Sequence, residues 1–332
     1  LLARIYARLE RNSSIGTKDA VLLLLDYGFP LALGSILSGF GTQFYRFLIS
    51  RSCPADVIGN YSVALNFLTA MAFVVSPIST VLLPAFSKID EEVERKKLEA
   101  AFRASVKYSS LILAPVAFGM MAISRPLIFV LFGPKYSQAP VFLSLASIGQ
   151  MLCVIGASSS GPLLASQGDT KDIMRAWLIS LTVGIPASLF LIPKFGVYGL
   201  ISINIFTTFL TIALLDYSIY KNYGFAVDWS SSGKIFIASL SMAAIVWSIQ
   251  KILSALNQAI VLFTAGFVGV VAYLSFIALF RAMDHKDLRN LGEIAASLGK
   301  VGDIFIVFLR TIRFFARFFG NGFYDESHSP QN

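Results

Sequence analysis

The stretch of sequence that decides the fold is Tyr27–Ser50, which reads YGFPLALGSILSGFGTQFYRFLIS. Its first nineteen residues, Tyr27 to Tyr45, carry no charge. At a rise of about 1.5 Å per residue, a helix of that length is enough to cross a bilayer. The sequence therefore predicts a transmembrane helix over Tyr27–Ser50.

One charged residue, Arg46, follows directly on this apolar run. Ser35, Ser38, Thr42 and Arg46 are spaced by three or four residues and so share one helix face. Lipid offers no partner to such a face, which should therefore point at protein or water. Two interpretations stay open: the guanidinium reaches the headgroups about one turn from the helix end, or it lines an internal cavity.

The composition excludes an ordinary soluble protein. Of the 332 residues, 56% are hydrophobic and only 14% are charged, and the apolar residues come in long charge-free runs. Two cysteines, Cys53 and Cys153, and two histidines, His285 and His328, supply no disulfide framework and no metal site. We expect a multi-pass protein of the cell membrane, with no metal and no cofactor.

The charge-free runs predict an all-α fold, a polytopic membrane bundle of about eight transmembrane helices. After the first span, the predicted spans are Val57–Ser87, Tyr108–Ser124, a fourth within Pro140–Ala165, Ala176–Pro193, a sixth ending near Asp216, Ile235–Gln250 and Ile252–Phe280. Between the second and third, Lys88–Lys107 carries i,i+4 charge pairs on one face and Leu98, Phe102 and Val106 on another, which predicts a helix lying on the membrane surface. Residues 217–234 should form a polar loop. The divisions that follow are an N-terminal segment (1–26), a six-helix lobe (27–221), two additional helices (222–282) and a basic tail (283–332).

The placement of lysine and arginine orients this bundle. Segments that should share one side of the membrane hold 21 of the 27 basic residues, and the opposite side holds five. Basic residues are enriched on the cytoplasmic side, so both termini should be cytoplasmic. The net charge of +8 follows this membrane topology, and no nucleic-acid partner is expected.

The tail contains a basic amphipathic segment at 301–320. Arg310, Arg313 and Arg317 share one face and the apolar residues share another. Such a segment should lie on the anionic cytoplasmic leaflet and bind membrane lipids without spanning the bilayer.

Polar residues at membrane depth are the candidate functional groups. No nucleophile, base and orienting residue occur at a recognisable spacing, no phosphate loop is present, and the acidic residues fall in loops, tails or helix ends, so no enzyme activity is expected. A cleft with hydroxyls, amides and an arginine would suit a sugar bearing phosphate, because the guanidinium fork matches phosphate oxygens. The candidate substrate-binding residues are Thr42, Gln43, Arg46, Gln150 and Asn204.

The order of several segments resembles the C-terminal half of polysaccharide and lipid-linked oligosaccharide flippases of the multidrug/oligosaccharidyl-lipid/polysaccharide (MOP) superfamily. The segments that carry this resemblance are YGFPLALGSILSGFGTQFYRFLIS, VIGNYSVALNFLTAMAFVVSPISTVLLPAFSKI, LFGPKYSQA, LLASQGDTK and PKFGVYGLISINIF, which cover residues 28–216.

The resemblance implies a flippase that moves a polyprenyl-phosphate-linked oligosaccharide across the membrane for polysaccharide or glycan biosynthesis. The first six spans would correspond to the second of two lobes around a central cleft, the last two to an added pair, and the N-terminal lobe would be a missing partner. Many such proteins have an acidic residue where this chain has Tyr45, so an acid–arginine pair is not expected. The alternatives are a drug/cation antiporter of the same superfamily and a membrane-embedded glycan polymerase or ligase.

Overall fold

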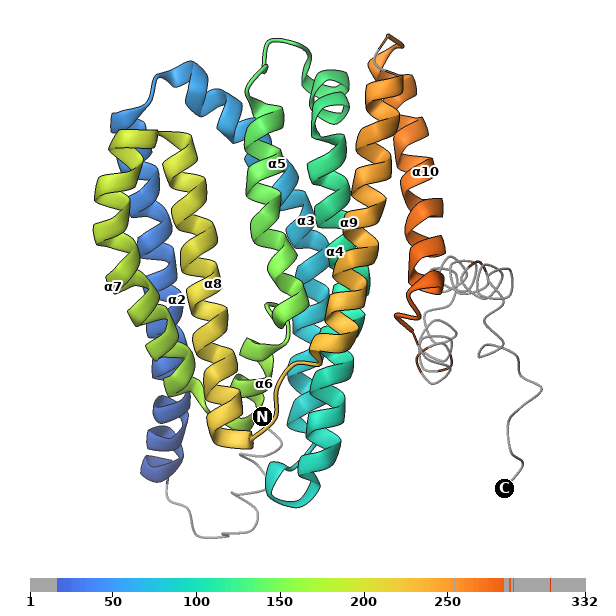
Figure 1. The fold of residues 1–332 in the computed structure, drawn as a ribbon. Helices are drawn as coiled ribbons and strands as arrows, with labels where there is room; N and C mark the ends of the chain where they lie inside the picture. Colours follow the sequence, from blue (N-terminus) through green and yellow to red (C-terminus); the bar gives the residue numbers. More distant parts are fainter. Residues whose placement is uncertain (1–16, 254, 284–286, 288, 290–310, 312–332) are drawn as a thin grey trace, which may run out of the picture.

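The computed structural model describes residues 17–253, 255–283, 287, 289 and 311, and this part of the chain is a helical bundle (Figure 1). The elements in chain order are α2 (Thr17–Ser52), α3 (Ala55–Ser87), α4 (Glu91–Phe132), α5 (Ala139–Gln150), the 3-10 helix η1 (Met151–Ile155), α6 (Ser160–Gln167), α7 (Thr170–Phe195), α8 (Val197–Tyr223), α9 (Trp229–Ile252) and α10 (Gln258–Leu279).

Seven of these helices are long and apolar enough to cross a membrane within the described residues. Two shorter pieces, Ala139–Ile155 and Ser160–Gln167, are bent by 46° relative to each other and together are long and apolar enough for an eighth crossing if they form one span. The prediction of an all-α membrane bundle with about eight spans is confirmed. The fourth predicted span is therefore a broken helix, which the apolar run within Pro140–Ala165 did not reveal.

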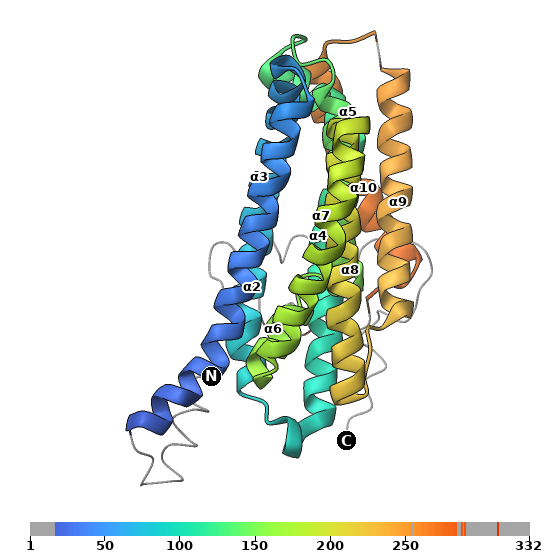
Figure 2. The same ribbon diagram turned by 90° about the vertical axis from the view of Figure 1, so that its left-hand side faces the viewer.

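The helices form three groups side by side. Helices α2, α7 and α8 lie together, α3, α4 and α5 occupy the middle, and α9 and α10 pack beyond α4 (Figure 1). In Figure 2, α2 and α3 run along one edge of the bundle and α9 along the other. The middle group therefore separates the last two helices from α2 and α7.

The segment Lys88–Lys107 differs from the expectation. It is not a separate surface helix, because α4 is one helix from Glu91 to Phe132 with a kink at Glu94. Leu98, Phe102 and Val106 are buried in a cluster with residues of α3, α6 and α8. The apolar face that was assigned to the membrane surface thus packs inside the protein, and the helix continues into the third span.

Three further boundaries moved outward. Helix α2 begins at Thr17, ten residues before the predicted start, and α4 carries on past Ser124, the predicted end of the third span, to Phe132. The predicted loop at 217–234 shrinks to residues 224–228. Gly224 ends α8 in the left-handed conformation (φ 70°), which glycine adopts without strain.

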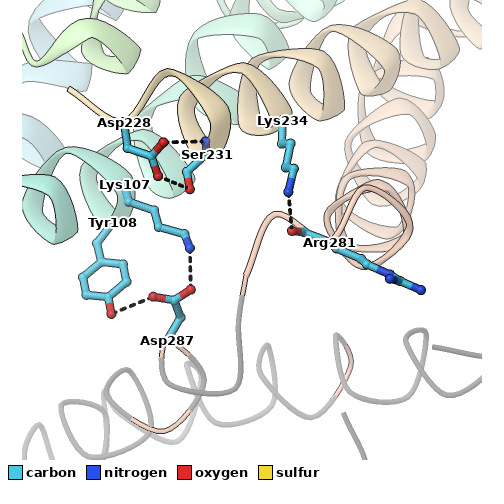
Figure 3. Close-up of polar contacts among 7 residues, drawn as sticks. All are labelled: Lys107, Tyr108, Asp228, Ser231, Lys234, Arg281 and Asp287. Carbon is cyan, nitrogen blue, oxygen red and sulfur yellow. Dashed lines mark hydrogen bonds and ion pairs between the residues drawn. The ribbon is translucent and has the colours of Figure 1, made fainter. Parts of the chain in front are cut away.

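Polar contacts tie the chain after α10 to the inner part of α4 and to the start of α9 (Figure 3). The Lys107 ammonium lies 2.5 Å from Asp287 Oδ2, and the Tyr108 hydroxyl donates to Asp287 Oδ1 at 3.1 Å. Lys234 donates to the carbonyl oxygen of Arg281. The amphipathic segment predicted at 301–320 lies outside the described residues, apart from Thr311.

Candidate functional site: a polar cleft with one arginine

A cleft of about 430 Å³ lies between α2, α3, α8 and the broken span. Most of its lining is apolar, and the polar members come from all four of these elements. They are Thr42, Tyr45, Arg46, Tyr61, Gln150, Ser158, Asn204 and Thr208. A mostly apolar cleft with a few converging polar groups is the usual form of a small-molecule site.

Helix periodicity places the residues of α2 on the cleft wall. Thr42 and Arg46 are four residues apart and so lie one above the other on the same face. Tyr45 is 6% exposed and is held between helices, because its hydroxyl lies against Gly184 of α7. A side chain at position 184 would occupy the same space, so the glycine allows Tyr45 to sit where α2 meets α7.

Arg46 supplies the only charge among the residues that line the cleft. Within the described part of the chain its guanidinium has neither a carboxylate partner nor a hydrogen bond. The side-chain amide of Gln150 has no hydrogen bond there either. A guanidinium has five N–H donors in a planar fork. The cleft therefore combines positive charge with uncommitted donors, which favours an anionic ligand.

The structure brings four of the five predicted residues together. Thr42, Arg46, Gln150 and Asn204 line one cleft, whereas Gln43 is exposed and lies outside its lining. Arg46 is among the lining residues and its side chain is exposed, so its role in the cavity stays a prediction beside its reach to the headgroups. The two tyrosines, Tyr45 and Tyr61, were not expected in the site, since a tyrosine in an apolar run carries no signal that separates a cleft wall from a core.

The broken span forms one end of the cleft. The chain turns at Gly156, which has a φ of 102°, a conformation that suits glycine. Near the break, hydroxyls of neighbouring helices lie 3.2 Å from two backbone carbonyl oxygens: Ser110 of α4 from Cys153 O and Ser79 of α3 from Ser158 O. Cys153 O also accepts from the Gly156 N–H at 3.1 Å. The hydroxyls of Ser158 and Ser159 are buried and have no partner in the described part of the chain.

A carboxylate also meets this break, which corrects the prediction that acidic residues fall in loops, tails or helix ends. Asp216 lies inside α8, seven residues before its last residue, Tyr223. Its Oδ1 is 2.5 Å from the hydroxyl of Ser160, the first residue of α6. The prediction misplaced Asp216 because the sixth span seemed to end near this residue, whereas α8 continues for about two turns beyond it.

Comparison with known proteins agrees with this architecture. Residues 6–141 match the family model described as "Polysaccharide biosynthesis protein". The "Probable low-salt glycan biosynthesis flippase Agl15" of Haloferax volcanii is 22% identical over 265 residues, covering 77% of this chain and 55% of that protein. The "Lipopolysaccharide biosynthesis protein WzxC" of Escherichia coli is 30% identical over 189 residues, covering 57% of this chain and 32% of that protein.

Solved structures show the same fold. The structure titled "Lipid II flippase MurJ, inward closed conformation" aligns with a TM-score of 0.64 at 17% identity, over 76% of this chain and 53% of that one. An outward-facing multidrug resistance MATE family transporter of the MOP superfamily aligns with a TM-score of 0.54 at 12% identity. The chain is thus similar over residues 6–141 to the polysaccharide biosynthesis family model, and its fold is that of these solved structures. It spans about a third to a half of the length of these first relatives, and the MOP-type bundle described here is that portion.

Proposed function

We propose that this chain is part of a flippase that moves a polyprenyl-phosphate-linked oligosaccharide from the cytoplasmic to the outer leaflet. The observation that carries the proposal is the cleft in which Arg46 is the sole lining charge. Phosphate oxygens would accept from the guanidinium fork. Thr42, Gln150 and Asn204 would bind sugar hydroxyls beside it, and the polyprenyl tail would stay in the bilayer.

Movement would occur by alternating access between this lobe and a second, N-terminal lobe. Helices α2 and α3 support this pairing, because only 11% and 6% of their most apolar stretches are buried within this bundle. Large apolar side chains such as Phe40 and Phe73 are more than half exposed there. A second lobe on one side and lipid on the other would cover them, with rocking of the two lobes around the cleft.

A drug/cation antiporter fits the cleft less well, because a positively charged drug would meet the positive charge of Arg46. A glycan polymerase or ligase would need catalytic groups, whereas the similar proteins include two that are named as flippases and one named as a transport protein. We therefore propose translocation without covalent change of the substrate, by a multi-pass protein whose termini are both cytoplasmic.

The test is a translocation assay of Arg46 variants in the full-length protein, at matched abundance in the membrane. Arg46→Ala should weaken head-group binding by about 1.5–3 kcal/mol, the range for a hydrogen bond to a charged group, or roughly ten- to a hundredfold. Arg46→Lys should recover part of this loss, since an ammonium keeps the charge but not the fork.

The matched control is Arg51→Ala, which removes an arginine from the last turn of the same helix but outside the cleft lining. This variant should transport like the wild type. Full activity of Arg46→Ala and Arg46→Lys would contradict the proposed role of the cleft.

A further inference from the structure

The contact between Asp216 and the broken span has a hydrogen-bonding pattern that allows only two arrangements. The Ser160 hydroxyl lies 2.5 Å from Asp216 Oδ1 and 3.0 Å from the carbonyl oxygen of Gly156. A serine hydroxyl has one hydrogen and can donate to only one of these two acceptors. Two acceptors therefore compete for a single hydrogen at the bend of the span.

The protonation of Asp216 decides which acceptor receives that hydrogen. When Asp216 is ionised, the Ser160 hydroxyl turns to the carboxylate, and the Gly156 carbonyl loses the hydroxyl but keeps its two backbone donors, the N–H groups of Ser159 (2.8 Å) and Ser160 (2.9 Å). When Asp216 is protonated, its own O–H donates to Ser160 Oγ, and the Ser160 hydroxyl is released to donate to Gly156. One proton on Asp216 thus adds a hydrogen bond across the turn that joins η1 to α6.

Among the described residues, no ion pair holds Asp216 in its ionised form. The broken span, from Ala139 to Gln167, contains no charged residue, and Cys153 is its only titratable side chain. The other helices packed on α8 carry ionisable groups that form no ion pair with Asp216 among the described residues. These groups include Lys18, Asp26, Tyr27, Tyr45, Arg46 and Arg51 on α2, Asp56 and Tyr61 on α3, and Lys171, Asp172, Arg175 and Lys194 on α7; Tyr198, Tyr217, Tyr220, Lys221 and Tyr223 lie on α8 itself, and Asp228 follows Val227 in the next loop. Arg95 of α4 also reaches α8, where its guanidinium donates to the Tyr223 carbonyl oxygen.

We propose that Asp216, Ser160 and the Gly156 carbonyl form a proton-binding site that controls the bend of the broken span. The proton is exchanged with water, and no other bond is made or broken. The site touches the cleft through Ser158, which lies between Gly156 and Ser160 and lines the cleft wall. A change at the bend would therefore alter the cleft wall at Ser158. The coupling of proton binding to transport rests on the proposed function.

The proton itself can be observed on the full chain in lipid vesicles. Infrared difference spectra between acid and alkaline pH should contain the carbonyl stretch of a protonated carboxyl, and this band should be missing from Asp216→Asn. An apolar carbodiimide, which modifies protonated carboxyls, should label the Asp216 peptide at low pH and progressively less as the pH rises. Asp228 is the internal control, because the Ser231 hydroxyl and two backbone N–H groups hold it as a carboxylate.

Ser160→Ala separates this site from an ordinary buried acid. The variant removes a charge-assisted hydrogen bond from the ionised form and only neutral ones from the protonated form, and the charge-assisted bond is about twice as strong. Because the Gly156 carbonyl also keeps its backbone donors, the band and the labelling should persist to a higher pH, by up to roughly one unit. Ser166→Ala in the same helix is the matched control: its hydroxyl donates to Leu163 O, away from Asp216, and its titration should equal that of the wild type.

Two results would overturn the proposal: the absence of a band assignable to Asp216 between about pH 5 and about pH 9, a range that covers buried carboxyls, and identical titrations of Ser160→Ala and the wild type. Neither result bears on Arg46. Conversely, a failed Arg46 experiment with a successful titration would leave a proton site in a protein of different activity.

Discussion

At the scale of single residues, Gly199 lies where two stretches of backbone approach each other closely. Gly199, in the first turn of α8, lies against the end of α7, where an added Cβ would fall 2.2 Å from the Leu191 carbonyl oxygen. A carbonyl oxygen cannot rotate away as a side chain can. Alanine at this position must push the two helices apart.

Gly199→Ala should therefore lower the free energy of unfolding by about 1–3 kcal/mol, the usual cost of overpacking. The measurement is the midpoint of thermal unfolding in detergent. Gly233→Ala is the control, because a Cβ there has nothing within 4 Å and alanine is favoured over glycine in a helix by about 1 kcal/mol. If both variants were equally stable, the two helices would not be in the close contact described.

At the scale of the secondary-structure element, the start of α9 depends on one carboxylate. Asp228 accepts from the backbone N–H of Ser230 at 3.1 Å, from the N–H of Ser231 at 3.4 Å and from the Ser231 hydroxyl at 2.6 Å. The Ser231 hydroxyl, followed by the backbone donors and the nearby Lys107 charge, lowers the pKa of Asp228 below its ordinary value. The carboxylate is thus the form that caps the helix.

Asp228→Ala should destabilise the protein by about 0.5–2 kcal/mol, the cost of losing an N-cap. Since the pKa is lowered in the folded state, the charged cap contributes fully above its unfolded pKa of about 3.9, and this contribution is lost as the pH falls through the lower folded value. Asp228→Asn keeps a capping oxygen without the charge. Unfolding followed from neutral to acid pH should show the gap between wild type and Asp228→Asn closing; a constant gap would argue against the charged cap.

The helices themselves were largely predictable, for a physical reason that also explains the exceptions. Charge-free runs report membrane crossing, which needs about 20 apolar residues, so the number of spans followed from the sequence. A charge-free run does not indicate where a helix without a proline bends, and the turn at Gly156 is such a bend. Such runs also do not report a tertiary partner, which is why Leu98 and Phe102 were placed on the membrane surface.

At the scale of the whole molecule, the topology can be tested directly. In a variant in which both native cysteines, Cys53 and Cys153, are replaced, a cysteine introduced at Lys135 or Lys194 should react with an impermeant thiol reagent added outside intact cells. A cysteine at Lys97 should react only after the cells are opened. Reaction at position 97 in intact cells would reverse the proposed orientation of both termini.

The cleft was only partly predictable, because it is made by helices distant in sequence. Helix periodicity relates Thr42 to Arg46, but nothing in the sequence says that α2 faces Gln150 and Asn204. Those two residues were chosen because a buried amide is costly, and both line the cleft. Gln43 was chosen as a polar residue at membrane depth on the first span, and it is exposed and outside the cleft lining. Polarity therefore identifies candidates, and only packing selects among them.

The lone charge of Arg46 has a consequence for the way in which such a cleft can shut. Sealing a guanidinium away from water without an anion costs several kcal/mol, so an empty, dry, occluded state is disfavoured. An anion that enters the cleft offsets this free-energy cost of closure, whether it is the phosphate of a substrate or a carboxylate from another part of the protein. The arginine that attracts the substrate would then also disfavour closure of the empty cleft, since the cleft would close readily only with an anion bound.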